Sequence, residues 1–434
     1  MPISIDLQNR IIPILPQIIE EFGTPFFIYD EKGIVETSLN LKNAFKGLPS
    51  GFKEFFAVKA NPNPKILAIM REMGFGFDCS SVTELKLARQ AGAKPKDIMF
   101  TSNDTSQEEF AAALQEGGCI LNLDDIGMVD KIDHFPGGLA CFRYNPGPRR
   151  TGNSIIGNPA EAKYGVPHEQ IINAYREARK KGATRFGIHT MICSNELSYQ
   201  YMVTTVKMLL DVVEMIETEL NIKFEFINMG GGLGIPYKPE QSPLPLKQMA
   251  QEIKELLIEF KKIHGYTPKL LMESGRYITG PHGIFVTKCI NQKHGYKEYR
   301  GVDSCCTSSV VRPAMYWSKD HPDDGWHYIS ILKKNCRPKN RSLTEIVNIV
   351  GATCENNDYF CHDRKLPKII ESDIIIVHDV GAHAPAMGNN YNGRLRPQEL
   401  LLRLDGSIEL IRRAQTFDDY VKQFYDFESK ILKF

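Results

Sequence analysis

The sequence lacks a long apolar run, an excess of charge of either sign, and any low-complexity or tandemly repeated segment. Because no stretch of 18 or more apolar residues occurs, we expect no membrane-spanning segment and no membrane partner. The 53 Lys and Arg residues balance 52 Asp and Glu residues, and this near-neutral charge predicts no nucleic-acid partner. The 434 residues, 42% of them hydrophobic and 24% charged, predict a globular chain of two domains.

The ten cysteines are scattered, with no Cys-x-x-Cys pair and none of the dense spacing that is typical of a small disulfide framework. The N-terminus shows no secretory signal. We therefore expect reduced thiols in a cytoplasmic protein, and we expect no metal site.

Between residues 31 and 275, strand-like apolar runs alternate with segments whose apolar residues follow helical spacing. Eight runs, each separated from the next by a helix, predict an α/β fold of the (β/α)8 barrel type rather than an open sheet. The runs are residues 55–58, 76–78, 98–100, 118–121, 140–143, 186–189, 224–227 and 270–273.

From residue 276 to 434 the strand-like runs have few helices between them, which predicts a second, mainly β domain, built as a sandwich or barrel. These runs are residues 283–287, 346–350, 374–377 and 400–404. Residues 1–30 end in one more strand-like run, 24–30, which can belong to either domain. We expect this N-terminal segment to pack with the β domain.

Lys59 directly follows the apolar run 55–58. A lysine at the C-terminal end of a barrel strand lies where the active sites of such barrels form. Desolvation there lowers the pKa of an amine and makes it a nucleophile toward an aldehyde. Taken alone, a solvated lysine at the end of a strand is the simpler interpretation.

A glycine-rich loop, Asn228-Met229-Gly230-Gly231-Gly232-Leu233-Gly234, follows the run 224–227. Glycines at this place let backbone N–H groups approach an anion closely. The spacing fits neither the dinucleotide pattern nor a P-loop, so a phosphate cradle and a flexible turn both remain open.

Two further loops contain carboxylates or a thiol. Glu273-Ser274-Gly275-Arg276 follows the apolar residues 270–272, and a carboxylate there can keep a pyridine nitrogen protonated, although a surface ion pair is the simpler alternative. Residues 351–358 place Cys354 and Glu355 after a strand-like run. A thiol can donate a proton to a carbanion, and a small buried cysteine is the alternative.

Together, these segments resemble the fold-type III pyridoxal-phosphate (PLP) decarboxylases, the family of diaminopimelate, ornithine and arginine decarboxylases. The resemblance spans nearly the whole chain and rests on residues 56–61, on residues 76–85, on the glycine loop and on Glu273-Ser274-Gly275-Arg276, which resembles the family's Glu-Pro-Gly-Arg. It implies an alanine-racemase-like barrel, PLP as cofactor, and a homodimer with shared active sites.

The resemblance makes Lys59 the lysine that binds PLP, and it makes Cys354, contributed across the dimer interface, the thiol that protonates the substrate carbanion. The cofactor contacts that it implies are Lys59, Asp78, Met191, Ser194, Gly231, Gly232, Glu273, Gly275, Arg276 and Tyr391.

Diaminopimelate decarboxylases are the subgroup that the sequence resembles most. Residues 312–316, Arg-Pro-Ala-Met-Tyr, resemble that subgroup's Arg-Pro-Ala-Leu-Tyr, and Cys354-Glu355 resembles its Cys-Glu pair. An arginine at 312 suits a distal carboxylate better than a bare ammonium tail. The implied substrate contacts are Arg276, Arg312, Tyr316, Glu355 and Tyr391, and the implied reaction converts meso-diaminopimelate to L-lysine.

Besides Ser274, which replaces the proline of Glu-Pro-Gly-Arg, three positions depart from the family pattern. Met191 stands where the family has a histidine that stacks on the PLP ring, Asn228 replaces an aspartate, and His383 replaces a tyrosine. These departures suggest a divergent branch that acts on another diamino acid, or on a D-amino acid such as D-ornithine or D-lysine.

Two other functions remain as alternatives. In the alanine racemases of this architecture an arginine faces the pyridine nitrogen, so Glu273 favours decarboxylation over racemisation. A non-catalytic PLP-binding relative is the other alternative, and such relatives lack a β domain. The retention of Lys59 and Cys354 favours an enzyme.

Overall fold

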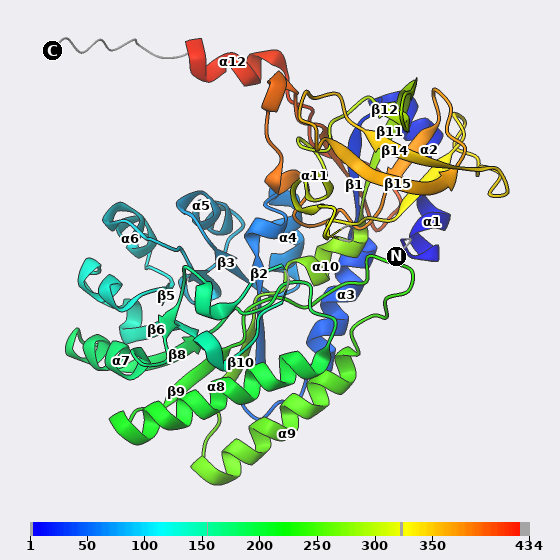
Figure 1. The fold of residues 1–434 in the computed structure, drawn as a ribbon. Coiled ribbons are helices and arrows are strands. Elements are labelled where there is room, and N and C mark those ends of the chain that lie inside the picture. The colour runs from blue at the N-terminus through cyan, green and yellow to red at the C-terminus, as the bar shows by residue number, and fades with distance from the viewer. Residues whose placement is uncertain (1–2, 154, 322–323, 426–434) are drawn as a thin grey trace. The chain divides into compact units, whose positions relative to one another are not determined.

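The structure is a computed structural model that describes residues 3–153, 155–321 and 324–425 (Figure 1). Among these residues, no helix is long and apolar enough to cross a membrane.

The chain divides into two compact units. The barrel unit comprises Ile34–Pro236 and Gln241–Gly280, and the β unit comprises Met1–Gly33, Tyr237–Glu240 and Pro281–Phe434. The sequence predicted boundaries after residues 30 and 275. Both boundaries of the barrel unit fall later, after Gly33 and Gly280, and the second does so because the short helix α10 (Arg276–Thr279) continues the barrel unit beyond its last strand.

Eight parallel strands of the barrel unit close on themselves within the described residues, since β5 pairs with β4 on one side and β6 on the other. The (β/α)8 barrel is therefore confirmed. The strands are β2 (Phe52–Ala57), β3 (Gly76–Cys79), β4 (Ile98–Phe100), β5 (Ile120–Leu123), β6 (Leu139–Asn145), β8 (Arg185–His189), β9 (Phe224–Asn228) and β10 (Lys269–Met272), and the two-residue β7 (Val166–Pro167) adds to β6.

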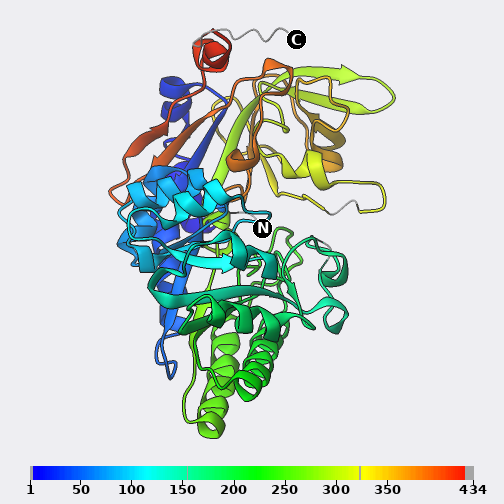
Figure 2. The same ribbon diagram turned by 90° about the vertical axis from the view of Figure 1, so that its left-hand side faces the viewer.

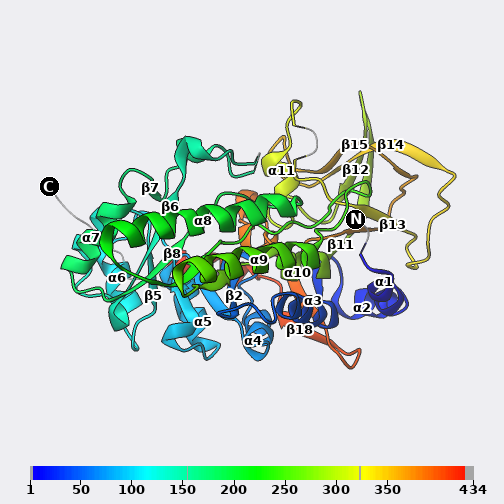
Figure 3. The ribbon, with the colours of Figure 1, turned by 90° about the horizontal axis from the view of Figure 1, so that it is seen from below.

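The helices of this unit begin and end at residues suited to those places. Ser106 and Glu109 form a capping box on α6, and Asn221 ends α8 in the left-handed conformation. Helices α8 and α9 lie side by side (Figures 1 and 3). The helices are α3 (Glu31–Ala44), α4 (Pro64–Glu72), α5 (Val82–Gln90), α6 (Gln107–Leu114), α7 (Ile171–Lys180), α8 (Tyr199–Leu220) and α9 (Leu246–His264).

The barrel interior is apolar along part of its strands and polar where they end. A buried cluster fills it with side chains from several strands: Phe55, Met99, Leu139, Cys141, Phe226 and Leu271. Gly187 leaves room for the Phe226 ring, because a Cβ at position 187 would overlap that ring. The C-terminal strand ends instead carry the buried polar side chains Asp78, His189, Asn228 and Glu273, which marks that end of the barrel as the place for chemistry.

The β unit contains a mixed sheet in which β1 (Phe26–Asp30) pairs parallel with β17 and antiparallel with β11. Strands β11 and β12 form a long hairpin, seen in yellow-green in Figure 2. Besides β1, the strands of this unit are β11 (Gly283–His294), β12 (Glu298–Val302), β13 (Ile329–Leu332), β14 (Thr344–Val350), β15 (Tyr359–Pro367), β16 (Ile374–Val377), β17 (Gln398–Leu402) and β18 (Ile408–Arg412). Its helices are α1 (Ile5–Ile11), α2 (Leu15–Phe22), α11 (Arg312–Tyr316) and α12 (Phe417–Tyr425).

Candidate active site

Lys59 lies in the 3-10 turn that directly follows β2, and its Nζ is 3.7 Å from Asp78 Oδ2 at the end of β3. The Lys59 side chain is 49% exposed, whereas Asp78 is buried. Burial and the nearby Glu273 charge raise the pKa of Asp78 to about 7, although the Lys59 charge opposes the shift. Asp78 Oδ1 has no hydrogen-bond partner among the described residues.

Glu273, at the end of β10, is held by two buried side chains. Asn228 Nδ2 donates to its Oε1 at 2.7 Å, and His189 Nε2 lies 3.1 Å from its Oε2. Burial by itself would raise the pKa of Glu273, but the His189 imidazole, the Lys59 charge and the Asn228 hydrogen bond hold that pKa below its ordinary value. An ionised carboxylate only accepts hydrogen bonds, so His189 Nε2 carries the proton.

The glycine loop passes so close to its neighbours that side chains are excluded. A Cβ at Gly230, Gly231 or Gly232 would come within 2.6 Å of Thr190 O, Glu273 O or Cys193 Sγ, respectively. The loop therefore requires glycine whether or not it binds an anion. Its Gly231 N–H donates to Met191 Sδ at 3.2 Å. A thioether is a weak acceptor, so this N–H remains available to a phosphate oxygen.

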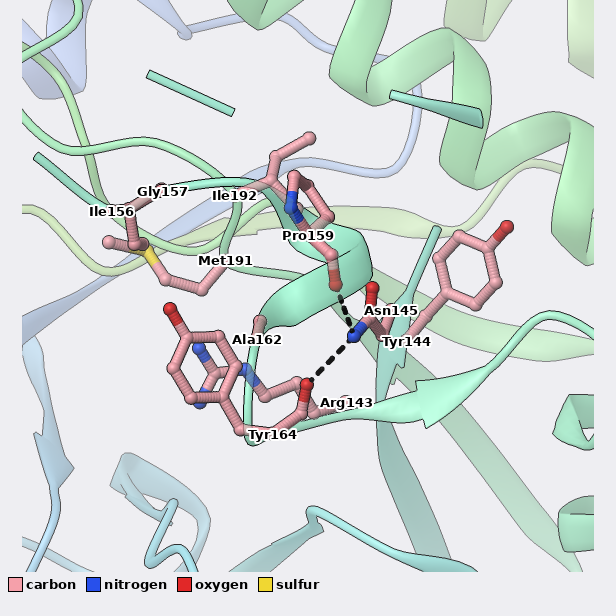
Figure 4. A pocket seen from close by; sticks show the side chains of 10 residues that line it. All are labelled: Arg143, Tyr144, Asn145, Ile156, Gly157, Pro159, Ala162, Tyr164, Met191 and Ile192. Carbon is pink, nitrogen blue, oxygen red and sulfur yellow. Dashed lines mark hydrogen bonds between the residues drawn. The ribbon is translucent and has the colours of Figure 1, made fainter. Parts of the chain in front are cut away.

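A pocket borders Met191 on the side of β6 (Figure 4). The Arg143 guanidinium lies 3.7 Å from the centroid of the Tyr164 ring and 3.6 Å from Asp124. Asn145 fixes the loop that lines the pocket, since its Nδ2 donates to the carbonyls of Pro159 and Tyr164 (Figure 4). Arg143 was not predicted as a site residue, although it ends the predicted strand 140–143.

Three more of the predicted cofactor residues, Ser194, Gly275 and Arg276, lie in the barrel unit. Ser194 exchanges two hydrogen bonds with Asn153. Gly275 caps α10, where a Cβ would lie 2.5 Å from the Cβ of Ala60 beside Lys59. Arg276, the first residue of α10, is buried.

Cys354 lies in the β unit with an exposed side chain. Its N–H donates to Asn392 Oδ1 at 2.9 Å, and its Sγ lies 3.5 Å from the Tyr391 hydroxyl. The hydrogen bonds from Tyr391 and Asn392 lower the pKa of the thiol. Buried Asp358 fixes the loop before Cys354 by accepting from the N–H and hydroxyl of Thr353.

Arg312 begins α11 and is buried, with its guanidinium 4.7 Å from the centroid of the Tyr316 ring. Val311 before it has a φ of 62°, a conformation that costs a β-branched residue about 1–3 kcal/mol. Exposed Glu355 accepts a hydrogen bond from the N–H of Asn357. The structure thus brings Arg312 to Tyr316 and Cys354 to Tyr391.

The predicted residues therefore form two groups. One group belongs to the barrel unit, where Asp78 lies 3.7 Å from Lys59, and the other group, in the β unit, consists of Arg312, Tyr316, Cys354, Glu355 and Tyr391. His189 and Asn228 were seen in the sequence only as parts of motifs, and their hydrogen bonds to Glu273 were not foreseen. Within residues 3–153, 155–321 and 324–425, no group of His, Cys, Asp and Glu is arranged to hold a metal ion.

A family model and related proteins both identify this chain as similar to pyridoxal-dependent decarboxylases, and the related proteins match nearly the whole chain. Residues 32–280 match the family of the pyridoxal-dependent decarboxylases, pyridoxal binding domain. Protein TabA of Pseudomonas amygdali pv. tabaci is 42% identical over 420 residues, 97% of this chain and 96% of TabA. The diaminopimelate decarboxylase of Methanothermobacter thermautotrophicus is 34% identical over 411 residues, 94% of this chain and 92% of that protein.

Solved structures agree with these relatives. The crystal structure of diaminopimelate decarboxylase from M. jannaschii in co-complex with L-lysine has a TM-score of 0.84 at 27% identity and covers 94% of both chains. The lysine/ornithine decarboxylase of Vibrio vulnificus complexed with putrescine is 20% identical, with a TM-score of 0.74 over 92% of this chain and 99% of that chain, and shows a shared fold.

Proposed function

We propose that this chain, which belongs to the pyridoxal-dependent decarboxylase family, converts meso-diaminopimelate to L-lysine and carbon dioxide. The chain is a PLP-dependent amino-acid decarboxylase with the alanine-racemase-like fold of its relatives. The observation that supports this substrate is the buried guanidinium of Arg312 beside Tyr316. A planar guanidinium matches the second carboxylate of a diacid, which lysine and ornithine lack.

The barrel unit has groups that fit PLP. The glycine loop has no side chains of its own beside the Gly231 N–H, so a phosphate group can approach that N–H. Asp78 has a buried oxygen without a hydrogen-bond partner among the described residues. Each Glu273 oxygen accepts one hydrogen bond, from His189 or Asn228, and so keeps a lone pair for a ring N–H. We assign Lys59 to the cofactor aldehyde, the glycine loop to the phosphate and Glu273 to the ring nitrogen.

When bound, PLP supplies an electron sink for the pair that remains after the α-carboxylate leaves as carbon dioxide. Glu273, kept ionised by His189 and Asn228, holds a proton on the ring nitrogen. The Cys354 thiol, oriented by Tyr391, delivers a proton to the α-carbon. Arg312 holds the distal carboxylate, and Glu355 accepts from the distal ammonium group.

A substrate panel tests the proposal: meso-diaminopimelate, L-lysine, L-ornithine, L-arginine, D-lysine and D-ornithine, with carbon dioxide and amine product both measured. Diaminopimelate is expected to have the highest kcat/KM. Arg312→Ala should reduce that value by about 30-fold or more, since breaking a buried charge pair costs roughly 2–5 kcal/mol. Arg341→Ala, at an exposed position of the same unit, is the control and should leave kcat/KM unchanged.

Met191 supports a second candidate, decarboxylation of another diamino acid, including D-ornithine or D-lysine. Its sulfur lies against Gly231, where it cannot act as the cationic, hydrogen-bonding partner that a histidine provides. If the panel shows rapid turnover of D-lysine or D-ornithine and none of diaminopimelate, the first substrate is wrong and this one replaces it. Racemase activity is disfavoured because Glu273 is ionised, and loss of optical activity without carbon dioxide release would reveal it.

We also propose a homodimer whose subunits share active sites, since Cys354 is exposed on the β unit of its own chain. Mixing Lys59→Ala subunits with Cys354→Ala subunits should restore about a quarter of the wild-type activity, because half the dimers are then hybrid with one intact site each. A sedimentation experiment should give twice the chain mass. Two inactive variants that exchange subunits and never complement would contradict site sharing.

A further inference from the structure

Glu54 is a buried carboxyl group that the mechanism above does not use. It lies on β2, five positions before Lys59, and faces Met272 of β10 across the parallel strand pair. Its relative exposure is 2%, and the described residues provide no cation to pair with it. Buried carboxyl groups without a cation are rare, so this side chain calls for an explanation.

The contacts of Glu54 are with Ser274, the residue that follows Glu273. The Ser274 N–H donates to Glu54 Oε1 in a short hydrogen bond, and the Ser274 hydroxyl lies 3.4 Å from Glu54 Oε2. The N–H of Glu273 donates to Gly230 O at 2.9 Å. The main chain on both sides of the Glu273 side chain is therefore fixed, on one side by the glycine loop and on the other by Glu54.

We propose that Glu54 is a positioning residue of the PLP site, which clamps the main chain at Ser274 and thereby sets the position of the Glu273 carboxylate. The inference rests on the assignment of Glu273 to the ring nitrogen of PLP. It does not depend on which amino acid is the substrate.

The protonation states of the two carboxyl groups agree with this role. Burial, and then the charge of Glu273, raise the pKa of Glu54 well above its ordinary value, whereas the pKa of Glu273 is lowered. A raised pKa favours the protonated form of Glu54, and one of its oxygens accepts the Ser274 N–H. A second negative charge here would favour protonation of Glu273, so an uncharged Glu54 suits the role.

Ser274 is necessary for the same contact. The family pattern that the sequence resembles has proline at this position, and proline has no N–H to donate. Glu54 and Ser274 therefore form a pair in which each supplies the partner that the other needs. Removal of one member leaves a buried polar group unsatisfied, whereas removal of both does not.

The test uses the holoenzyme in five forms: wild type, Glu54→Gln, Glu54→Leu, Ser274→Pro and the double variant Glu54→Leu/Ser274→Pro. The visible absorption spectrum of bound PLP, its pH titration and the PLP dissociation constant are measured, and none of these needs a substrate. Failure of diaminopimelate turnover would therefore leave this test intact.

Glu54→Gln keeps an acceptor for the N–H and a donor for the hydroxyl, so its spectrum and PLP affinity should stay within about twofold of wild type. Glu54→Leu and Ser274→Pro should each shift the visible band and weaken PLP binding about tenfold. The double variant should regain most of the wild-type affinity. If Glu54→Leu does not fold, Glu54→Asp replaces it, because the shorter side chain withdraws the acceptor from Ser274.

A control separates positioning from general stability. Asp97, the last residue of the 3-10 turn before β4, pairs with Lys53 in the same unit, so Asp97→Asn should lower the melting temperature without moving the spectrum. The inference is overturned if Glu54→Leu melts normally and keeps the wild-type spectrum. It is also overturned if Glu54→Gln is as impaired as Glu54→Leu, because the charged form of Glu54 would then be the one required.

Discussion

The free energy of unfolding of the PLP-free chain should fall as the pH rises, because of Asp78. Burial raises the pKa of this carboxyl to about 7 in the folded chain from an ordinary value of 3.8. The folded state therefore binds the proton more tightly than the unfolded state does. The stability that this proton provides is complete below about pH 4 and is lost as the pH rises through the folded-state pKa.

The size of the effect follows from that shift. Each pKa unit corresponds to about 1.4 kcal/mol, so a shift from 3.8 to about 7 amounts to about 4 kcal/mol when Asp78 is fully ionised. About 2.5 kcal/mol of this falls between about pH 5 and pH 8. Asp78→Asn removes the titratable group and keeps the shape of the side chain. Between about pH 5 and pH 8, the free energy of unfolding of the variant should therefore rise by about 2.5 kcal/mol relative to that of the wild type.

Urea unfolding of both proteins at several pH values measures the difference. The exposed Asp211, which pairs with Lys207, gives the control, and the difference between Asp211→Asn and wild type should change little with pH. A difference for Asp78→Asn that stays constant from pH 5 to pH 8, or that grows toward acid, would refute the reasoning. It would mean that the Lys59 ammonium 3.7 Å away keeps Asp78 ionised despite its burial.

Three further predictions concern single residues. Lys59→Ala should abolish the visible absorption of the purified protein, and borohydride should fix PLP on Lys59 of the wild type; a pyridoxyl group mapped to another lysine would contradict the assignment. Cys354→Ala should keep that absorption but lower kcat about 100-fold or more, measured as amine product, because the proton donor is lost. Arg300→Met should cost about 3–5 kcal/mol in urea unfolding, since buried Arg300 pairs with Glu345, and the double variant with Glu345→Met should cost less.

The barrel could be predicted from the sequence because each of its strands is a short apolar run followed by a helix. Even so, the predicted run 118–121 begins two residues before β5. Gly117 and Gly118 have φ values of 85° and 82° and form the turn before the strand. The run 55–58 likewise misses the first residues of β2 and includes Val58, which already belongs to the next turn.

The arrangement of the β unit was harder to predict because its pairings join distant parts of the chain. The N-terminal strand β1 lies between β11 and β17, which begin more than 250 residues later. Periodicity within a segment says nothing about such partners. The second, mainly β domain is confirmed, and its described residues form a mixed sheet of nine strands.

In the site, the motifs located the ends of the strands but not the contacts between them. The sequence indicated Glu273, yet neither His189 nor Asn228 was predicted to hold its carboxylate. A pattern shows which residues follow a strand, whereas a hydrogen bond depends on side-chain direction around a closed barrel. Glu54 is a clearer case, since a charged residue next to an apolar run is usually interpreted as an exposed strand position, and the predicted run began only at residue 55.

Three of the positions that depart from the family pattern, Asn228, Ser274 and Met191, support Glu273 or the glycine loop, whereas His383 belongs to the β unit. Asn228 donates to Glu273 and accepts from the N–H of Gly230, and an aspartate could do only the second. Ser274 supplies the N–H that Glu54 accepts, and Met191 accepts from Gly231. Because an aspartate at 228 would add a negative charge against Glu273, the asparagine lets that carboxylate stay ionised. These departures therefore change how Glu273 and the glycine loop are supported, while the carboxylate proposed to hold the ring nitrogen is kept.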